Sequence, residues 1–288
     1  MKSRTVLIVG CGDLGIRCGS ALAGAGAKVT GVRRDVSRLP GSIAGHAADY
    51  TVADSLAFAE ALAPDYVIAT FNPFDRSVDG YKAGFARAME NLLAGLGGHR
   101  PAHIIMSSST RVYAESEGGW VHEDSALTDS DTFAAHIIAA EKALLESGHN
   151  ATVVRFAGIY GIPGGRLLSR VRRGELCPAE PVSYTNRIHR EDAGGFLAHL
   201  VAMVERDEAP RAVYNGVDDL PAPRYEVECW LAQQMGLDNF AQGATPAGDP
   251  TRHNRSGHKR VKNVALRETG FEPAYPDYRA GYGALLGM

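Results

Sequence analysis

Little in the sequence would support a metal centre, a disulfide framework or a membrane span. The four cysteines form no Cys-x-x-Cys pair, and the ten histidines form no His-Glu-x-x-His pattern. We therefore expect no metal site and expect reduced thiols, as in a cytoplasmic protein. The apolar runs fall well short of the roughly 20 residues that a helix needs to cross a membrane.

The chain also lacks an excess of charge of either sign. Its 30 Lys and Arg residues nearly balance its 33 Asp and Glu residues, which leaves a net charge of −3. A surface of this kind has no long-range field that would attract nucleic acid or an anionic membrane. We expect neither as a partner, and instead predict a small-molecule substrate whose identity the sequence does not reveal.

What the sequence does contain is a regular alternation of short apolar runs and longer amphipathic segments. Strands are predicted at Thr5–Val9, Lys28–Val32, Gly45–Tyr50, Asp65–Thr70, His103–Ser107 and Thr152–Ile159. Helices are predicted at Leu14–Ala25, Ser55–Leu62, Tyr81–Leu96 and Phe133–Glu146. This alternation is typical of a parallel sheet covered by helices. The predicted fold is α/β, a Rossmann-type doubly wound parallel sheet with a small C-terminal α/β lobe.

A glycine motif directly follows the first predicted strand. Gly10-Cys11-Gly12-Asp13-Leu14-Gly15 has the G-x-G-x-x-G spacing and opens the first helix. In such a motif the glycines permit a tight turn, close approach of a pyrophosphate to the backbone, and close packing of helix on strand. The helix N-terminus adds unpaired N–H groups and the positive end of its dipole. The motif predicts a dinucleotide site that includes Gly10, Gly12, Asp13, Leu14 and Gly15.

The end of the second predicted strand indicates which dinucleotide is bound. Enzymes that use NAD usually carry an acid there, which accepts hydrogen bonds from the ribose 2′-hydroxyl. This chain instead has Arg33 and Arg34, and two guanidinium groups attract a 2′-phosphate through charge-assisted hydrogen bonds. The predicted cofactor is therefore NADP(H), and NAD is the less favoured alternative.

Three further segments resemble a known family. Ser107-Ser108-Ser109-Thr110-Arg111-Val112-Tyr113 resembles an "SSxxVYG" segment; the other two are Arg155–Gly161 and Ile188–Ala193. In this order they resemble the extended short-chain dehydrogenase/reductases, which include nucleotide-sugar epimerases and dehydratases. The resemblance implies an NAD(P)-dependent oxidoreductase, epimerase or dehydratase acting on a small carbonyl or sugar-nucleotide-like substrate, with Ser107 beside the cofactor. It also implies a homodimer as one possible assembly.

The tyrosine and lysine that this family uses for proton transfer are absent. Alignment on Glu141 places Phe133 at the tyrosine position and Ile137 at the lysine position. The loss of a positioned general acid or base typically slows a reaction by about 10² to 10⁴. The sequence thus predicts an atypical member with a non-standard acid or base. A catalytically silent NAD(P)-binding sensor or partner-binding protein is the alternative.

Other polar residues are candidates for catalysis or for substrate binding. The catalytic candidates are Ser109, Tyr113 and His136, and the substrate-binding candidates are Arg187 and His189. A basic segment near the C-terminus, with Arg255, Lys259, Arg260 and Lys262, either holds an anionic group or is a solvated face.

The alternating pattern is interrupted after about residue 160 by a Gly- and Pro-rich turn. A helix at Glu191–Glu205 and a strand at Val213–Val217 restore the pattern. The predicted dinucleotide-binding core is therefore 1–161, completed by 187–218. Residues 162–186 and 219–288 are predicted to form a small lobe on the substrate side, over the edge of the sheet where ligands bind.

Overall fold

The computed structural model describes residues 4–237 and 258–288 of the chain, which divides into two compact units. Unit 1 consists of Met1–Val112, Thr128–Arg155 and Ala193–Tyr214. Unit 2 consists of Tyr113–Leu127, Phe156–Asp192 and Asn215–Met288. All residues of the predicted small lobe belong to unit 2. The predicted core shares most of its residues with unit 1, although Tyr113–Leu127 groups with unit 2.

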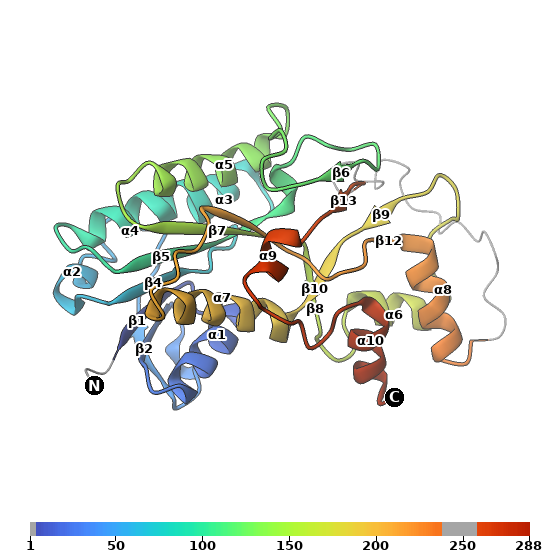
Figure 1. The fold of residues 1–288 in the computed structure, drawn as a ribbon, viewed down its shortest axis with the longest axis horizontal. Coiled ribbons are helices and arrows are strands. Elements are labelled where there is room, and N and C mark those ends of the chain that lie inside the picture. The colour runs from blue at the N-terminus through green and yellow to red at the C-terminus, as the bar shows by residue number, and fades with distance from the viewer. Residues whose placement is uncertain (1–3, 238–257) are drawn as a thin grey trace. The chain divides into compact units, whose positions relative to one another are not determined.

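Unit 1 is built on a parallel sheet with the strand order β11-β7-β5-β4-β1-β2-β3 (Figure 1). β1 pairs in parallel with both β2 and β4, so the chain builds the sheet outward from its middle in both directions. Ligands bind such a sheet at the carboxyl ends of the strands where the order reverses. The strands are β1 (Thr5–Val9), β2 (Lys28–Arg33), β3 (Ile43–Ala47), β4 (Tyr66–Ala69), β5 (His103–Ser109), β7 (Ala151–Phe156) and β11 (Val213–Gly216).

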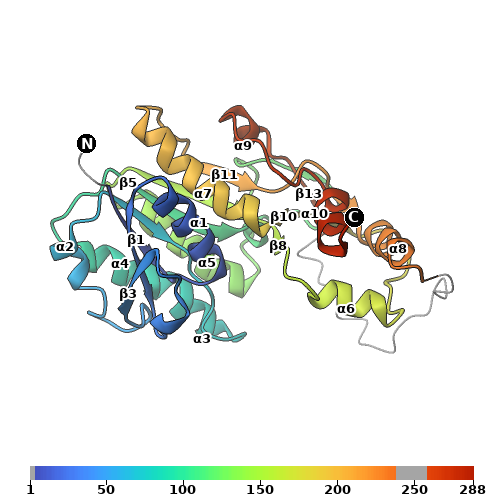
Figure 2. The ribbon, with the colours of Figure 1, turned by 90° about the horizontal axis from the view of Figure 1, so that it is seen from below.

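Helices cover both faces of this sheet, as Figures 1 and 2 show. One face carries α2 (Phe58–Leu62), α3 (Val78–Tyr81), α4 (Ala88–Leu96) and α5 (Thr132–Leu145), and the other carries α1 (Asp13–Gly24) and α7 (Arg190–Glu205). α1 and α7 approach so closely that a Cβ atom on Gly194 would lie 2.6 Å from the Cβ of Arg17. The doubly wound α/β fold predicted from the sequence is confirmed.

The predicted third strand was placed too far along the chain. β3 spans Ile43–Ala47 rather than Gly45–Tyr50, and Ile43 pairs with Val29 of β2. The chain turns after the strand because the Asp49 carboxylate accepts hydrogen bonds from the backbone N–H and the hydroxyl of Thr51, at 3.0 and 2.7 Å. A local side-chain turn of this kind competes with strand pairing and ended the strand early.

Two other elements are less regular than predicted. The helix expected at Tyr81–Leu96 begins earlier, at Val78, where Ser77 caps it, and it contains a π-helical turn at Lys82–Arg87. The strand expected at Thr152–Ile159 ends at Phe156, and β8 (Gly158–Tyr160) leaves the main sheet to pair with another strand. By contrast, α5 begins and ends within one residue of its predicted bounds. Asp131 accepts hydrogen bonds from the first two N–H groups that follow Thr132 in α5.

Unit 2 contains short two-stranded sheets and four helices among its described residues. β8 pairs with β10 (Arg187–His189), β9 (Tyr184–Thr185) with β12 (Ala222–Pro223), and β6 (Trp120–Val121) with β13 (Arg260–Val261). The helices are α6 (Arg166–Arg172), α8 (Arg224–Gln234), α9 (Val264–Glu268) and α10 (Tyr278–Leu286). A core cluster around Leu168, Leu231 and Tyr278 joins α6, α8 and α10.

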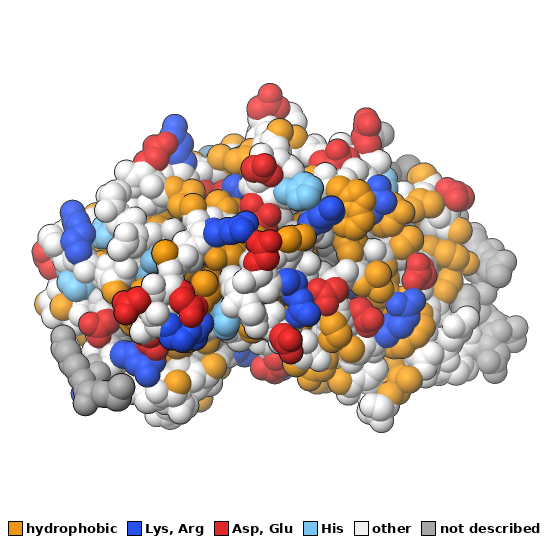
Figure 3. Space-filling view, in the orientation of Figure 1, with side chains coloured by type: hydrophobic (Ala, Val, Ile, Leu, Met, Phe, Trp, Pro, Cys, Tyr) orange, Lys and Arg blue, Asp and Glu red, His pale blue; other side chains and the backbone are white. Residues whose placement is uncertain are grey.

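Surface charges of both signs are interspersed on the face seen in Figure 3, in keeping with the balanced composition. In residues 4–237 and 258–288, no helix is long and apolar enough to cross a membrane. Nor do three or more His, Cys, Asp or Glu side chains come together as metal ligands anywhere in the described chain.

Candidate functional site

The glycine motif forms the turn between β1 and α1. Gly10 has φ +80, a left-handed conformation that favours glycine, and a Cβ atom there would lie 2.7 Å from the carbonyl oxygen of Thr70. Gly15 is equally constrained, because its Cβ would lie 2.9 Å from Ile8 on β1. Gly12 has open space in front of it, with no atom nearer than 3.7 Å to an added Cβ.

The N-terminus of α1 is open to a ligand. Gly12 is the N-cap residue, and no side chain supplies a capping hydrogen bond there. The first N–H groups of a helix have no partner within the helix, and together with its dipole they favour an anion. The open space in front of Gly12, together with the unpaired N–H groups at the start of α1, forms a cradle that fits a phosphate group.

A cavity of about 370 Å³ in unit 1 connects this turn with the segment that follows β2. Gly10–Gly12 line it on one side and Arg33, Arg34 and Arg38 on another. Arg38 was not predicted as a site residue. It lies in a short 3-10 helix, Val36–Arg38, that Asp35 caps. The Asp-x-Ser cap, which begins two residues after Arg33, is the signal that would have revealed it.

The three guanidinium groups keep most of their donor capacity. Arg33 donates one hydrogen bond, from Nη1 to the carbonyl oxygen of Cys11, at 3.2 Å. Arg34 is 67% exposed at its side chain, lies 4.0 Å from the Asp49 carboxylate, and stacks on the Phe74 ring at 5.3 Å. Arg38 forms an exposed ion pair with Asp35 at 3.3 Å. Together with the Gly12 cradle, this donor set fits a dinucleotide that carries several phosphates.

The other predicted cofactor residues lie outside the lining of this cavity. Asp13 is exposed in the first turn of α1 and pairs with Arg17, at 3.3 Å. Leu14 is half-buried, and Gly15 packs against β1 as described above. Ser107 is buried near the carboxyl end of β5.

Ser108 and Ser109, at the end of β5, have different hydrogen-bond partners. Ser108 is buried and donates a hydrogen bond to Glu141 of α5. Glu141 also accepts from Arg155, whose Nη2 lies 2.8 Å from Oε2, so this glutamate is part of a buried ion pair. Ser109 is half-buried, and its Oγ accepts a hydrogen bond from the backbone N–H of Arg111, at 3.2 Å. The Ser109 hydroxyl hydrogen can therefore still be donated.

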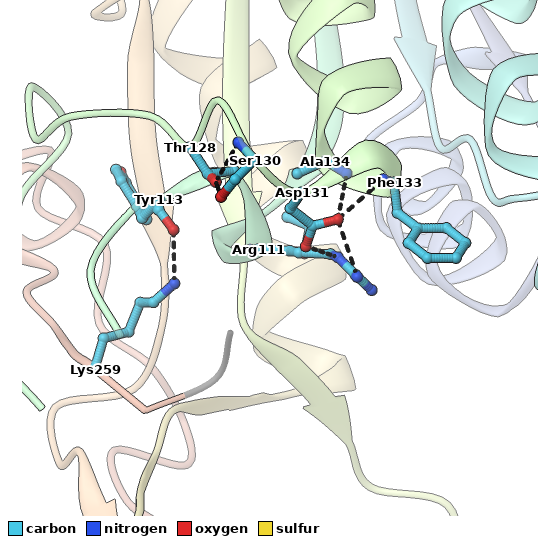
Figure 4. Close-up of polar contacts among 9 residues, drawn as sticks. Arg111, Tyr113, Thr128, Ser130, Asp131, Phe133, Ala134 and Lys259 are labelled. Atoms are coloured by element: carbon cyan, nitrogen blue, oxygen red, sulfur yellow. Dashed lines mark hydrogen bonds and ion pairs between the residues drawn. The ribbon is translucent and has the colours of Figure 1, made fainter. Parts of the chain in front are cut away.

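A guanidinium group lies against the ring of Phe133, the residue that the sequence aligns with the family's tyrosine (Figure 4). Arg111 stacks on Phe133 at 4.8 Å and on Tyr81 at 5.8 Å, and the two rings meet edge-on. Asp131 fixes the guanidinium with two hydrogen bonds, at 2.6 and 3.1 Å. Burial alone would raise the pKa of Asp131, but Arg111 and the capped N–H groups of α5 outweigh it and lower this pKa.

Two further residues of α5 were singled out by the sequence. Ile137, which the sequence aligns with the family's lysine, is buried in the apolar core of unit 1. His136 is half-buried on α5, and none of the hydrogen bonds and ring contacts found in the described residues involves it.

Tyr113 belongs to unit 2 and is buried. Its hydroxyl donates to Oδ1 of Asn215 at 2.6 Å, and its carbonyl oxygen accepts from Nζ of Lys259 at 3.0 Å (Figure 4). Lys259 is itself buried, whereas Arg260 stacks on Trp120 and Tyr184 at 5.0 and 4.9 Å. Arg255, in the same basic segment, lies outside the described residues.

The two predicted substrate residues also belong to unit 2. Arg187 and His189 are buried on β10. His189 packs edge-on against Tyr160 and lies 3.9 Å from the Tyr275 ring, and its Nδ1 accepts from the N–H of Glu191 at 3.4 Å. Arg187 donates to Thr185 and stacks on Tyr278 at 5.3 Å.

The glycine turn, the strand order and the cavity have the features of a dinucleotide-binding fold, and comparison with known proteins agrees. A protein-family model described as NAD(P)H-binding matches residues 10–203. The chain belongs to this NAD(P)H-binding family. No curated protein matches it at a significant level.

Solved structures place this NAD(P)H-binding protein among the epimerase/dehydratase-like proteins of short-chain dehydrogenase/reductase fold. It is 32% identical to an NAD-dependent epimerase/dehydratase-like protein from Methylobacillus flagellatus, with a TM-score of 0.81 over 100% of this chain and 98% of that one.

Two more distant structures share the fold. A UDP-glucose 4-epimerase from Thermotoga maritima, solved with UDP-glucose, is 18% identical with a TM-score of 0.79, over 98% of this chain and 97% of that one. A UDP-glucuronic acid 4-epimerase from Bacillus cereus, solved with NAD, is 14% identical with a TM-score of 0.77, over 98% and 96%.

Proposed function

We propose that this NAD(P)H-binding protein uses NADP(H) to reduce a small carbonyl compound or to oxidise the corresponding alcohol. One observation carries the proposal. A single cavity of unit 1 is lined by the glycine turn Gly10–Gly12 and by three arginines, Arg33, Arg34 and Arg38. The relative at 32% identity is described as NAD-dependent, so the arginines are what favours NADP(H) in this chain.

Different residues of the cavity would bind different phosphate groups of the cofactor. The N–H groups at the start of α1 would bind the pyrophosphate beside Gly12. The guanidinium groups of Arg33, Arg34 and Arg38 would bind the 2′-phosphate through charge-assisted hydrogen bonds. An acid at the end of β2 would repel that phosphate; the nearest one, Asp35, is occupied with Ser37 and Arg38.

Ser109 is the residue that we propose for catalysis. The bound nicotinamide would supply or accept the hydride, and the Ser109 hydroxyl would donate a hydrogen bond to the substrate oxygen. In the direction of reduction, water would supply the proton that this oxygen takes up. Its Oγ already accepts from the Arg111 N–H, which orients the hydroxyl. Because Phe133 and Ile137 replace the usual acid and its lysine, we expect turnover about 10² to 10⁴ below that of a complete proton relay. Tyr113 and His136 stay sequence-based predictions.

The cofactor proposal is tested by Arg33→Ala, with Arg87→Ala as the control. Arg33 lines the cavity, whereas Arg87 is exposed elsewhere in unit 1. Loss of one charge-assisted hydrogen bond is worth roughly 1.5–3 kcal/mol, so Arg33→Ala should weaken NADPH binding by about tenfold or more. NADH binding should stay unchanged. Isothermal titration calorimetry of both dinucleotides measures the difference, and Arg87→Ala should match the wild type.

Two results would contradict the cofactor proposal. Equal affinity of the wild type for NADPH and NADH would remove the arginines from their proposed role. No heat with either dinucleotide would remove the function altogether.

The catalytic role of Ser109 is tested by Ser109→Ala in a turnover assay. NADPH oxidation is followed by absorbance with a panel of small aldehydes and ketones. We expect the variant to bind NADPH as the wild type does and to lose about tenfold or more in kcat with the best substrate, because one hydrogen bond to the developing alkoxide is missing. Ser147→Ala, on the surface of unit 1 after α5, is the matched control. An unchanged kcat in Ser109→Ala would refute the role.

A further inference from the structure

Two buried charged side chains of unit 2 each leave one polar atom without a partner. Arg187 on β10 is 6% exposed; its Nη2 donates to Thr185, but Nη1 has no partner in the described chain. Asp218, just after β11, is 2% exposed; its Oδ1 accepts from the N–H of Leu220 at 3.2 Å, but Oδ2 has no partner there. Buried polar groups are normally hydrogen-bonded. An unpaired donor and an unpaired acceptor in the same unit therefore indicate a site for a group that can both accept and donate a hydrogen bond.

The two side chains are neighbours that do not touch. Their backbones are joined by a hydrogen bond from the Asp218 N–H to the Arg187 carbonyl oxygen, at 2.7 Å. Burial raises the pKa of Asp218 to about 7, and the Arg187 charge is the largest influence that opposes it. The guanidinium therefore acts on the carboxylate through space, although the ion pairs of the described residues do not include this pair.

An aromatic ring lies against the Arg187 guanidinium, and two further tyrosines interact electrostatically with Asp218. The Arg187 guanidinium lies 5.3 Å from the ring centre of Tyr278 on α10. Tyr282 of the same helix packs against Tyr160 of β8, with ring centres 4.5 Å apart. Burial raises the pKa of both Tyr160 and Tyr282, and Asp218 raises each further, so these rings lie close to the carboxylate. Rings of this kind offer apolar faces to the carbon atoms of a ligand.

The charges of the surroundings restrict the chemistry of the missing group. It must accept a hydrogen bond from Arg187 Nη1 and donate one to Asp218 Oδ2. An anion would satisfy the arginine but would meet Asp218, with Asp277 and Asp219 adding to the negative field there. A cation would satisfy the carboxylate but would meet the unpaired guanidinium. A neutral group that both accepts and donates suits both atoms, and water and an alcohol hydroxyl are such groups. The nearby tyrosine rings favour the alcohol, because it brings carbon atoms that can pack against them.

We propose that Arg187 and Asp218 form a binding site in unit 2 for an alcohol hydroxyl of an uncharged ligand. Arg187 donates to the hydroxyl oxygen, and Asp218 accepts its hydrogen. This site is distinct from the cofactor cavity of unit 1, and its occupancy does not depend on NADP(H). It gives Arg187, a substrate-binding candidate in the sequence, an uncharged ligand, because a carboxylate with an unpaired oxygen lies in the same surroundings.

A matched pair of probes tests the proposal: glycerol, an uncharged triol, and glycerate, in which a carboxylate replaces one hydroxymethyl group. Binding is measured by saturation-transfer NMR above pH 7, where Asp218 is ionised. We expect the wild type to bind glycerol about tenfold more tightly than glycerate, the ratio that corresponds to about one charge-assisted hydrogen bond.

Asp218→Asn should reverse this preference. The Leu220 N–H holds the acceptor atom of the side chain in place, so the asparagine NH₂ would occupy the position of Oδ2. The site would then present two donors, which suit a carboxylate, and glycerate should bind better than glycerol. Asp124→Asn is the matched control, because Asp124 is an exposed aspartate of unit 2, and the preference of this variant should match that of the wild type.

A second measurement needs no variant and so stands even if Asp218→Asn does not fold. With carbon-13-labelled aspartate, NMR titration gives the pKa of Asp218 with and without glycerol. A hydroxyl that donates to the carboxylate stabilises its ionised form, so glycerol should lower this pKa. Arg187, Asp219, Asp277, Tyr160 and Tyr282 also act on the titration, and they are present in both samples.

Three results would overturn the proposal. The first is no binding of glycerol and an unchanged pKa of Asp218, which would mean that water alone fills the site. The second is a preference of the wild type for glycerate. The third is a folded Asp218→Asn variant with the same preference as the wild type.

Discussion

At the scale of single residues, the structure shows what surrounds the two positions that the sequence aligns with the family's tyrosine and lysine. The Phe133 ring is covered by the Arg111 guanidinium at 4.8 Å, so a cation stacks on an apolar ring there. Ile137 is buried in the core, and a lysine there would have to lose its hydration. A Phe133→Tyr change is therefore easier to accommodate than Ile137→Lys, and restoring the pair would also require space and solvent around position 137.

The glutamate used to align this region has a structural role that a substitution can reveal. Glu141 and Arg155 are 3% and 6% exposed at their side chains, and Ser108 donates to the same carboxylate. Glu141→Gln would remove the carboxylate that balances the buried Arg155 charge, which should lower the free energy of unfolding by about 3–5 kcal/mol. Urea denaturation followed by circular dichroism measures the change.

The control for this substitution lies on the same helix. Glu146 forms an exposed pair with Lys142 at 3.9 Å, and both side chains are about two-thirds or more exposed. Glu146→Gln should change the stability by less than about 1 kcal/mol. Equal effects of the two substitutions would mean that the buried pair contributes no more than a surface pair.

At the scale of elements, the strand β1, the glycine turn and the helix α1 together position the proposed cofactor cavity. Gly15 lets α1 lie directly on β1, since an added Cβ would come within 2.9 Å of Ile8 and 3.0 Å of the Thr70 hydroxyl. The close approach brings the helix N-terminus to the carboxyl end of β1, where the strand order of the sheet reverses. The third glycine of the motif is therefore required for the packing of α1 on β1.

Two alanine substitutions in α1 separate packing from helix propensity. Gly15→Ala should destabilise the protein by about 1–3 kcal/mol, because the methyl group meets the β1 side chains. Gly24→Ala, at the last residue of the same helix, meets no atom within 4 Å and should be neutral or stabilise by up to about 1 kcal/mol. Thermal unfolding of both variants measures the difference, and a stabilising Gly15→Ala would contradict the packing role.

The errors in predicted element boundaries have local causes. β3 ends at Ala47 because Asp49 turns the chain, and the helix expected at Tyr81 starts at Val78 because Ser77 caps it. Caps and side-chain turns of this type use ordinary polar residues, which occur throughout the sequence. The π-helical turn at Lys82–Arg87 is even less predictable. It includes Gly84, which lies against Asn72, and this tertiary contact has no signal in the local pattern.

For the whole molecule, the sequence by itself determined the features that depend on neighbouring residues. β1 occurs at the predicted residues, the helices fall close to their predicted positions, and the G-x-G-x-x-G motif identified the NAD(P)H-binding family that the comparisons confirm. These features follow from hydrophobic periodicity and from backbone conformations that glycine permits, which are properties of short segments.

Only the tertiary structure decided which polar groups meet. It added Arg38 to the cavity that Arg33 and Arg34 line, assigned Glu141 to a buried ion pair, and left one atom each of Arg187 and Asp218 without a partner. Such contacts join residues that are far apart in the sequence, and their energies depend on burial and on distance in three dimensions. A linear pattern contains neither quantity.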